Sequence, residues 1–190
     1  MTSRRYPGCG GAGMATAAEI RDLVDKMAAE RARLVAQARA FTDAEASRRP
    51  KGKTGEEEWS VKEQLAHLWE MERNYIAWMR RALAEDEPDV TEVRGEPVAI
   101  PVEQANAHSV AELLAALAAE RERTNAFIAA LTPEQFDRRA YHRLFGTLTV
   151  LQWLRSFYRH DRMHIDQMAG REPSYRPRYA TGVEPDQRRR

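Results

Sequence analysis

The sequence predicts an all-α protein, a four-helix bundle whose helices are joined by long crossover loops. Four segments repeat apolar residues at three- and four-residue steps, which is the period of one buried helix face. Each segment begins with a Ser or Thr followed three residues later by Glu or Gln, the pattern of a capping box. No convincing strand alternation appears, and 190 residues are enough for one domain with its own core.

The first two predicted helices each show one apolar stripe. The first begins at the cap Thr16, and its apolar residues recur from Ile20 to Phe41. The second spans about residues 60–84 and begins at the cap Ser60. Each stripe predicts one helix face that packs against the rest of the bundle.

The third and fourth predicted helices complete the bundle. The third spans about residues 104–131, with a cap at Ser109, and the fourth spans about residues 148–169, with a cap at Thr149. The fourth is strongly amphipathic, because its aromatic and aliphatic residues cover one arc and its arginines the opposite one.

Three connections separate these helices, at residues 42–58, 85–102 and 132–147. They are rich in Pro, Gly and charged residues, which end helices. The longer ones exceed the usual helix connection, so they favour crossovers over simple hairpins.

The ends of the chain differ in composition from its body. We expect a disordered leader at 1–13, a helical domain at 14–170 and a basic tail at 171–190, with Met14 as a second candidate start. The net charge of +1 is the sum of two basic ends and a mildly acidic body. A nucleic-acid binder would carry its basic residues on a folded face, so we expect no nucleic-acid partner.

Composition also bears on location and redox chemistry. No apolar run approaches the length needed to span a bilayer, so no membrane association is expected. The single cysteine, Cys9, cannot form an internal disulfide and lies in the glycine-rich leader. These features favour a cytoplasmic protein without a reactive thiol of its own.

One motif on the fourth predicted helix contains residues that could bind a metal ion. His160 and His164 lie four residues apart, so both imidazoles point the same way, and they share the apolar side of the helix. Such a pair can ligate a metal ion, or it can be two buried histidines bonded to carbonyl groups. His67, at the edge of the apolar arc of the second helix, is the best third ligand. His108 and His142 are expected in solvated loops.

Three neutral imidazoles leave a divalent metal with open positions, as a catalytic centre requires, whereas a closed structural site would want a fourth protein ligand. Zinc, nickel and iron all suit imidazole.

The residues also match a known family. The stretch from Trp59 to Leu68, the stretch from Phe145 to Leu154, and then His160, His164 and Gln167 resemble the DinB/YfiT-like superfamily over about residues 15–170. The resemblance implies a four-helix bundle of DinB/YfiT type that binds one divalent metal through a histidine triad, here His67, His160 and His164.

The resemblance further implies a reaction class. Its better understood members look like transferases and isomerases that use a low-molecular-weight thiol such as bacillithiol, mycothiol or glutathione, and others look like metal-dependent hydrolases. A metal-bound thiol or water would then attack a small electrophilic substrate, with no need for a protein cysteine. The family also leads us to expect a homodimer.

Further residues are candidates around the metal. Asp161 points into the apolar arc, where it could orient a ligating histidine, act as a base, or pair with an arginine of another helix. Glu63 and Gln167 lie one turn from the ligands and could reach a bound water. The candidate pocket residues are Gln64, Met71, Trp153 and Phe157.

Other functions compare less well with the sequence. A zincin protease would place Glu after the first histidine, and Glu184 lies in the tail, off any helix. A ferritin-like di-iron site needs two Glu-x-x-His motifs, which the sequence lacks. The real alternative is a non-catalytic bundle that binds a metal or small ligand, or simply dimerises.

Overall fold

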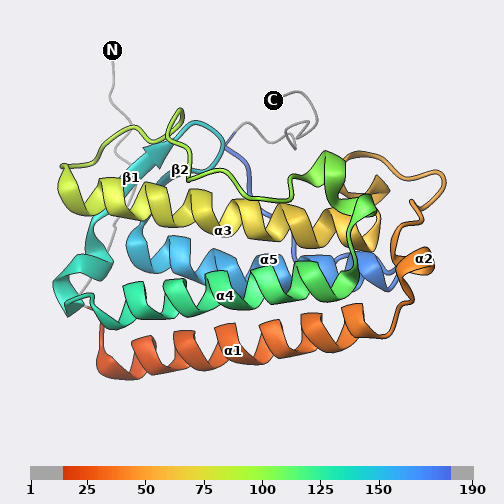
Figure 1. Ribbon diagram of the computed structural model, residues 1–190. Coiled ribbons are helices and arrows are strands. Elements are labelled where there is room, and N and C mark those ends of the chain that lie inside the picture. The colour runs from red at the N-terminus through yellow and green to blue at the C-terminus, as the bar shows by residue number, and fades with distance from the viewer. Residues whose placement is uncertain (1–14, 181–190) are drawn as a thin grey trace, which may run out of the picture.

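Four long helices make up most of residues 15–180, the part of the chain that the computed structural model describes (Figure 1). They are α1 Ala17–Arg39, α3 Val61–Ala84, α4 Val110–Ala129 and α5 Val150–Met168. All four begin with both hydrogen bonds of a capping box, at the four predicted caps. The all-α bundle is therefore confirmed. The predicted leader at 1–13 with Cys9, the candidate start Met14, and residues 181–190 of the tail lie outside the described residues.

The helices are not arranged in the order of the chain. Helix α1 packs against α5 and α4, and α3 packs against the same two helices. Figure 1 shows α1 and α5 running in one direction and α3 and α4 in the other. Consecutive helices α1 and α3 thus occupy opposite corners, and the connection between α3 and α4 runs back along the whole bundle. The predicted crossovers are confirmed.

Short elements fill the connections. A helical turn, α2 Asp43–Ala46, follows α1, and three 3₁₀ helices follow at Gly55–Glu58, Val102–Ala107 and Pro133–Asp137. The third predicted helix was placed too early, because residues 102–107 form a separate 3₁₀ helix and the chain breaks at His108 before the Ser109 cap.

A small two-stranded sheet accompanies the bundle, although the sequence shows no convincing strand alternation. Strands β1 Arg139–His142 and β2 Gly146–Thr149 pair antiparallel, with Arg139 opposite Thr149 and His142 opposite Gly146. Four-residue strands are too short to show a clear alternation of apolar and polar residues. Gly146 has a φ of 74°, which glycine adopts without strain.

The long crossover between α3 and α4 is fastened to α3 by its backbone. Trp78 Nε1 donates to the carbonyl oxygen of Val93 at 2.9 Å, and the Gly95 amide donates to Asn74 Oδ1 at 2.8 Å. A Cβ on Gly95 would lie 2.6 Å from the carbonyl carbon of Arg73, so only glycine allows this approach.

A layer of buried charge divides the hydrophobic core in two. The cluster near the hairpin contains Met27, Tyr75 and Phe157, and the other contains Leu34, Leu68 and Ile165. Between them lie four charged residues, one from each long helix, which we call the charge layer: Arg31, Glu72, Arg121 and Asp161.

The charge layer is closely hydrogen-bonded. Arg31 Nε donates to Asp161 Oδ2 at 2.9 Å and Arg31 Nη2 donates to Glu72 Oε2 at 2.9 Å. Arg121 Nε donates to Glu72 Oε1 at 2.8 Å. Although burial raises the pKa of Glu72, Arg31 and Arg121 hold it below its ordinary value of 4.5. The positive charges of two arginines and the negative charges of two carboxylates therefore cancel inside the bundle.

Within residues 15–180, no helix combines the length and hydropathy that crossing a lipid bilayer requires.

Substituting Gly95→Ala should destabilise the protein by about 1–3 kcal/mol, because the new Cβ collides with the backbone of α3. Urea denaturation followed by circular dichroism measures the loss. The control is Glu96→Ala, which removes an exposed side chain from the same segment and should leave the free energy of unfolding nearly unchanged. Equal stability of Gly95→Ala and wild type would contradict this close contact.

Substituting Glu72→Gln should cost about 3 kcal/mol at pH 7, because two buried arginines then share one carboxylate. Since the folded pKa of Glu72 is lowered, its contribution is present above pH 4.5 and is lost as the pH falls below it. The difference from wild type should therefore shrink in acid. Asp22→Asn, which removes an exposed ion pair with Lys26, is the control and should have little effect.

Candidate metal centre

Three imidazoles converge between α3 and α5. His67 Nε2 lies 3.3 Å from His160 Nε2, and His164 Nε2 lies 3.0 Å from the same atom. His160 and His164 share one face of α5 because they are four residues apart. Helix α3 runs antiparallel beside α5 and presents His67 to that face. The structure thus brings together the three histidines that the sequence singled out.

A carboxylate that the sequence analysis missed completes the cluster. Glu56 Oε1 lies 3.6 Å from His67 Nε2, and one ligand atom from each of the four residues lies within 4.8 Å of every other. Glu56 belongs to the 3₁₀ helix before α3 and is 4% exposed, unlike Glu57 and Glu58 beside it. In the sequence these three acids look like a solvated approach to a helix N-terminus, so only the fold distinguishes Glu56.

The donor set fits a divalent metal ion. Nitrogen ligands at about 2.05 Å from a tetrahedral zinc would lie roughly 3.3 Å apart. The two nitrogen separations of 3.3 and 3.0 Å are close to that spacing. Imidazole with one carboxylate suits zinc, nickel and iron alike.

Hydrogen bonds orient His164 for ligation. Gln64 Nε2 donates to the carbonyl oxygen of Trp59, and Gln64 Oε1 lies 3.2 Å from His164 Nδ1. Since an amide oxygen only accepts, the proton belongs on His164 Nδ1, and the Nε2 lone pair faces His160. The Trp59 ring packs against His67, with ring centroids 4.7 Å apart. Gln64 was predicted in the pocket, but it instead contacts Nδ1 of His164 and so orients that ring.

Burial keeps His160 and His164 neutral. It lowers the pKa of His160 to about 4, with Asp161 opposing the shift and Arg31 adding to it. Burial, with His160 as a neighbour, also places the pKa of His164 well below 6.5. Neutral imidazole is the form that binds a metal.

Asp161 belongs to the charge layer and pairs with its arginines. The sequence left open a role at a histidine or as a base, and a pairing with arginine. In the structure its carboxylate accepts from Arg31 Nε and Nη2 at 2.9 and 3.0 Å, and Arg121 Nη2 lies 3.5 Å away. Of these alternatives, the structure shows the pairing of Asp161 with arginines of other helices.

The other two predicted residues near the metal differ in their placement. Gln167 lies beside His164 and opposes the lowering of its pKa, and its Oε1 has no hydrogen-bond partner among residues 15–180. Glu63 accepts from the Ser60 amide at 2.8 Å and from Arg49, so it caps α3 and is not part of the four-residue cluster. The expectation that Glu63 could reach a bound water is corrected accordingly.

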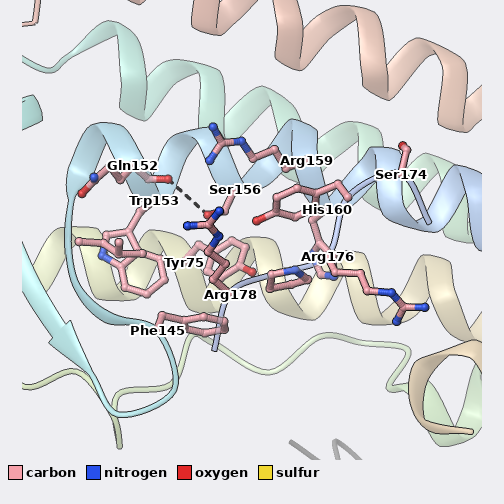
Figure 2. Close-up of a pocket in the computed structure, with 13 residues that line it drawn as sticks. Tyr75, Phe145, Gln152, Trp153, Ser156, Arg159, His160, Ser174, Arg176 and Arg178 are labelled. Carbon is pink, nitrogen blue, oxygen red and sulfur yellow. Dashed lines mark hydrogen bonds between the residues drawn. The ribbon is translucent and has the colours of Figure 1, made fainter. Parts of the chain in front are cut away.

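A pocket of about 660 Å³ opens onto the centre from one side (Figure 2). It lies between α5, the β-hairpin and residues 174–178, and of the four residues in the cluster His160 lines it. Of the four predicted pocket residues, Trp153 lines it. Met71 and Phe157 are absent from its lining and pack in the core cluster near the hairpin.

The two remaining histidines lie elsewhere. His108 sits between two helices with a 34% exposed side chain, as a loop position predicts. His142 was expected in solvent but is 4% exposed on β1, where its ring packs 4.6 Å from that of Trp78. The solvent position was expected because the short hairpin has no clear signal in the sequence. In the structure His142 belongs to strand β1, which directs its side chain toward the core.

Comparison with known proteins places these features in context. The family model of the DinB superfamily matches residues 26–168. The uncharacterized protein YuaE of Bacillus subtilis (strain 168) is 30% identical over 129 residues, which cover 61% of this chain and 78% of YuaE.

A solved structure supports the fold. The structure of YfiT from Bacillus subtilis, described as a probable metal-dependent hydrolase with an unusual four-helix bundle topology, superposes with a TM-score of 0.63. The match covers 87% of this chain and 90% of YfiT at 19% sequence identity, so it bears on the fold alone.

Proposed function

Because the chain belongs to the DinB superfamily and gathers three imidazoles and a carboxylate beside a pocket, we propose that it is a divalent-metal-dependent enzyme. Its substrate is a small electrophile, and the nucleophile is water or a low-molecular-weight thiol. His67, His160 and His164 hold the ion, which is zinc, nickel or iron. When bound, that ion lowers the pKa of the thiol or water and so supplies a nucleophile at neutral pH.

Side chains of the protein would orient the ligands and accept the proton. Gln64 keeps the proton of His164 on Nδ1, so that Nε2 stays a ligand. Glu56 Oε1, 3.6 Å from His67 Nε2, accepts the proton that leaves the thiol or water. The sulfur or oxygen then bonds to the electrophilic carbon, and the leaving group departs with its bonding electron pair.

The single observation that carries the proposal is the pocket that ends on His160. A metal that only stabilises the bundle needs no access, yet about 660 Å³ of space, within the range of small-molecule sites, lies against this ligand. Aromatic side chains on the pocket wall would exclude water from a bound electrophile.

Glu56 also supports a second candidate function. Three histidines and one glutamate could fill all four positions of a tetrahedral metal, as in a structural site. The protein would then be a metal-binding module without catalysis. The two functions differ in what Glu56 does, so substitution of this residue distinguishes them.

Purified protein should contain about one divalent metal ion per chain, and His160→Ala should lose most of it while remaining helical. Inductively coupled plasma mass spectrometry measures the metal, and circular dichroism measures the fold. His108→Ala, which removes a partly exposed histidine outside the cluster, is the matched control and should keep the metal. Unchanged metal content in His160→Ala would exclude the assigned site.

Substituting Glu56→Gln should leave most of the metal in place but lower turnover about 100-fold, because the proton acceptor is gone. Turnover is measured with 1-chloro-2,4-dinitrobenzene plus glutathione, bacillithiol or mycothiol, and with 4-nitrophenyl acetate for water as nucleophile. Glu57→Gln, on the same 3₁₀ helix but outside the cluster, is the control. Metal lost from Glu56→Gln, with no turnover by wild type in any assay, would support the non-catalytic module.

A further inference from the structure

The pocket beside the metal centre has an unbalanced charge. Three of the residues that line it are arginines, Arg159, Arg176 and Arg178, and none is Asp or Glu. The rest of the lining is apolar or uncharged, and this includes the neutral ring of His160. A small molecule in this space therefore meets positive charge that the pocket itself does not neutralise.

Two of the three arginines have no carboxylate partner in the described part of the chain. Arg176 Nη2 is paired with Glu57 Oε1 at 2.7 Å and Glu172 Oε1 at 2.6 Å. In contrast, no described carboxylate lies within 4.0 Å of the guanidinium nitrogens of Arg159 or Arg178. The Arg159 guanidinium instead lies 5.8 Å from the centre of the Tyr175 ring.

The segment that carries Arg178 is fixed across the pocket. The Ser174 amide donates to Asp166 Oδ2 at 2.9 Å, and the Ala180 amide donates to the Leu144 carbonyl oxygen at 2.6 Å. Figure 2 shows Arg178 reaching from this segment toward Ser156 of α5, whereas Arg176 points away. Arg178 thus comes from one wall of the pocket, and Arg159 comes from α5 on the other.

Aromatic rings lie beside the arginines and lead to the metal ligands. Phe145 and Trp153 pack with centroids 5.6 Å apart, and Tyr75 lies 5.9 Å from Trp153. The Tyr75 ring lies 6.3 Å from that of His160. A flat apolar body packed on these rings would extend from the arginines toward His160.

We propose that this pocket binds a small substrate that carries a carboxylate on an aromatic or other apolar body. Arg159 and Arg178 bind the carboxylate, since planar guanidinium groups match its two oxygens. The rings of Phe145, Trp153 and Tyr75 pack against the body, and the reacting atom lies at the His160 side. This inference rests on the proposed function, because it names the substrate class of the same site.

The test uses the full chain loaded with zinc and compares phenylacetate with uncharged phenylacetamide by isothermal titration calorimetry. Phenylacetate should bind about tenfold more tightly, and rising salt should reduce the difference. The double variant Arg159→Gln with Arg178→Gln should remove the preference. Arg171→Gln, whose arginine pairs with Asp166 outside the pocket, is the control and should keep it.

A second set of binding measurements tests whether the carboxylate binds to the metal itself. The preference for phenylacetate should persist in protein stripped of metal by a chelator, and in His160→Ala. A preference that disappears with the metal but survives in the double arginine variant would overturn the proposal. So would binding of phenyl phosphate without binding of phenylacetate, because the anion would then be a phosphate.

Failure of this inference can be told apart from failure of the proposed function. A chain that contains one metal ion and turns over an electrophile, but shows no preference for phenylacetate, refutes only the carboxylate site. A chain that contains no metal and has no turnover refutes the enzyme, whatever its preference between the two probes.

Discussion

The buried charge layer is the constraint on which the rest of the bundle depends. Arg31, Glu72, Arg121 and Asp161 come one from each long helix, and their side chains are at most 11% exposed. A helix that slid or turned by one residue would leave a buried charge without its partner, at a cost of several kcal/mol. Apolar stripes tolerate such shifts far better, because one methyl group can replace another. The layer therefore fixes the register in which α3 and α5 meet.

That register also decides where the candidate metal ligands point. Asp161 follows His160 directly, so holding its carboxylate on Arg31 and Arg121 fixes the turn of α5 that carries both histidines. The opposed charges also limit what the layer does to His160, because Asp161 raises the pKa of the ring while Arg31 lowers it. Burial is the largest cause of the shift. A neutral charge layer thus stands beside the centre without converting its imidazoles into cations.

Local signals in the sequence predict much of this structure. The capping pairs fix the starts of four helices, and the four-residue spacing of His160 and His164 needs only one helix to bring the rings together. His67 could be inferred because a lone inward histidine faces such a pair. Glu56, the burial of His142 and the partners of Asp161 could not, since each depends on segments far apart in the chain. The four-residue strands of the hairpin give no periodic signal of their own.

The four candidate metal ligands are divided between long helices and a short turn. Three imidazoles stand on long helices, where packing and the Gln64 contact fix their directions. Glu56 stands on a four-residue 3₁₀ helix that begins at Gly55, with a φ of 63°. A short turn outside the bundle shifts at lower cost than a helix whose register is fixed by buried charge. Of the four side chains that could hold a metal ion, Glu56 is therefore the one whose position changes at the lowest cost, while the three histidines stay fixed on their helices.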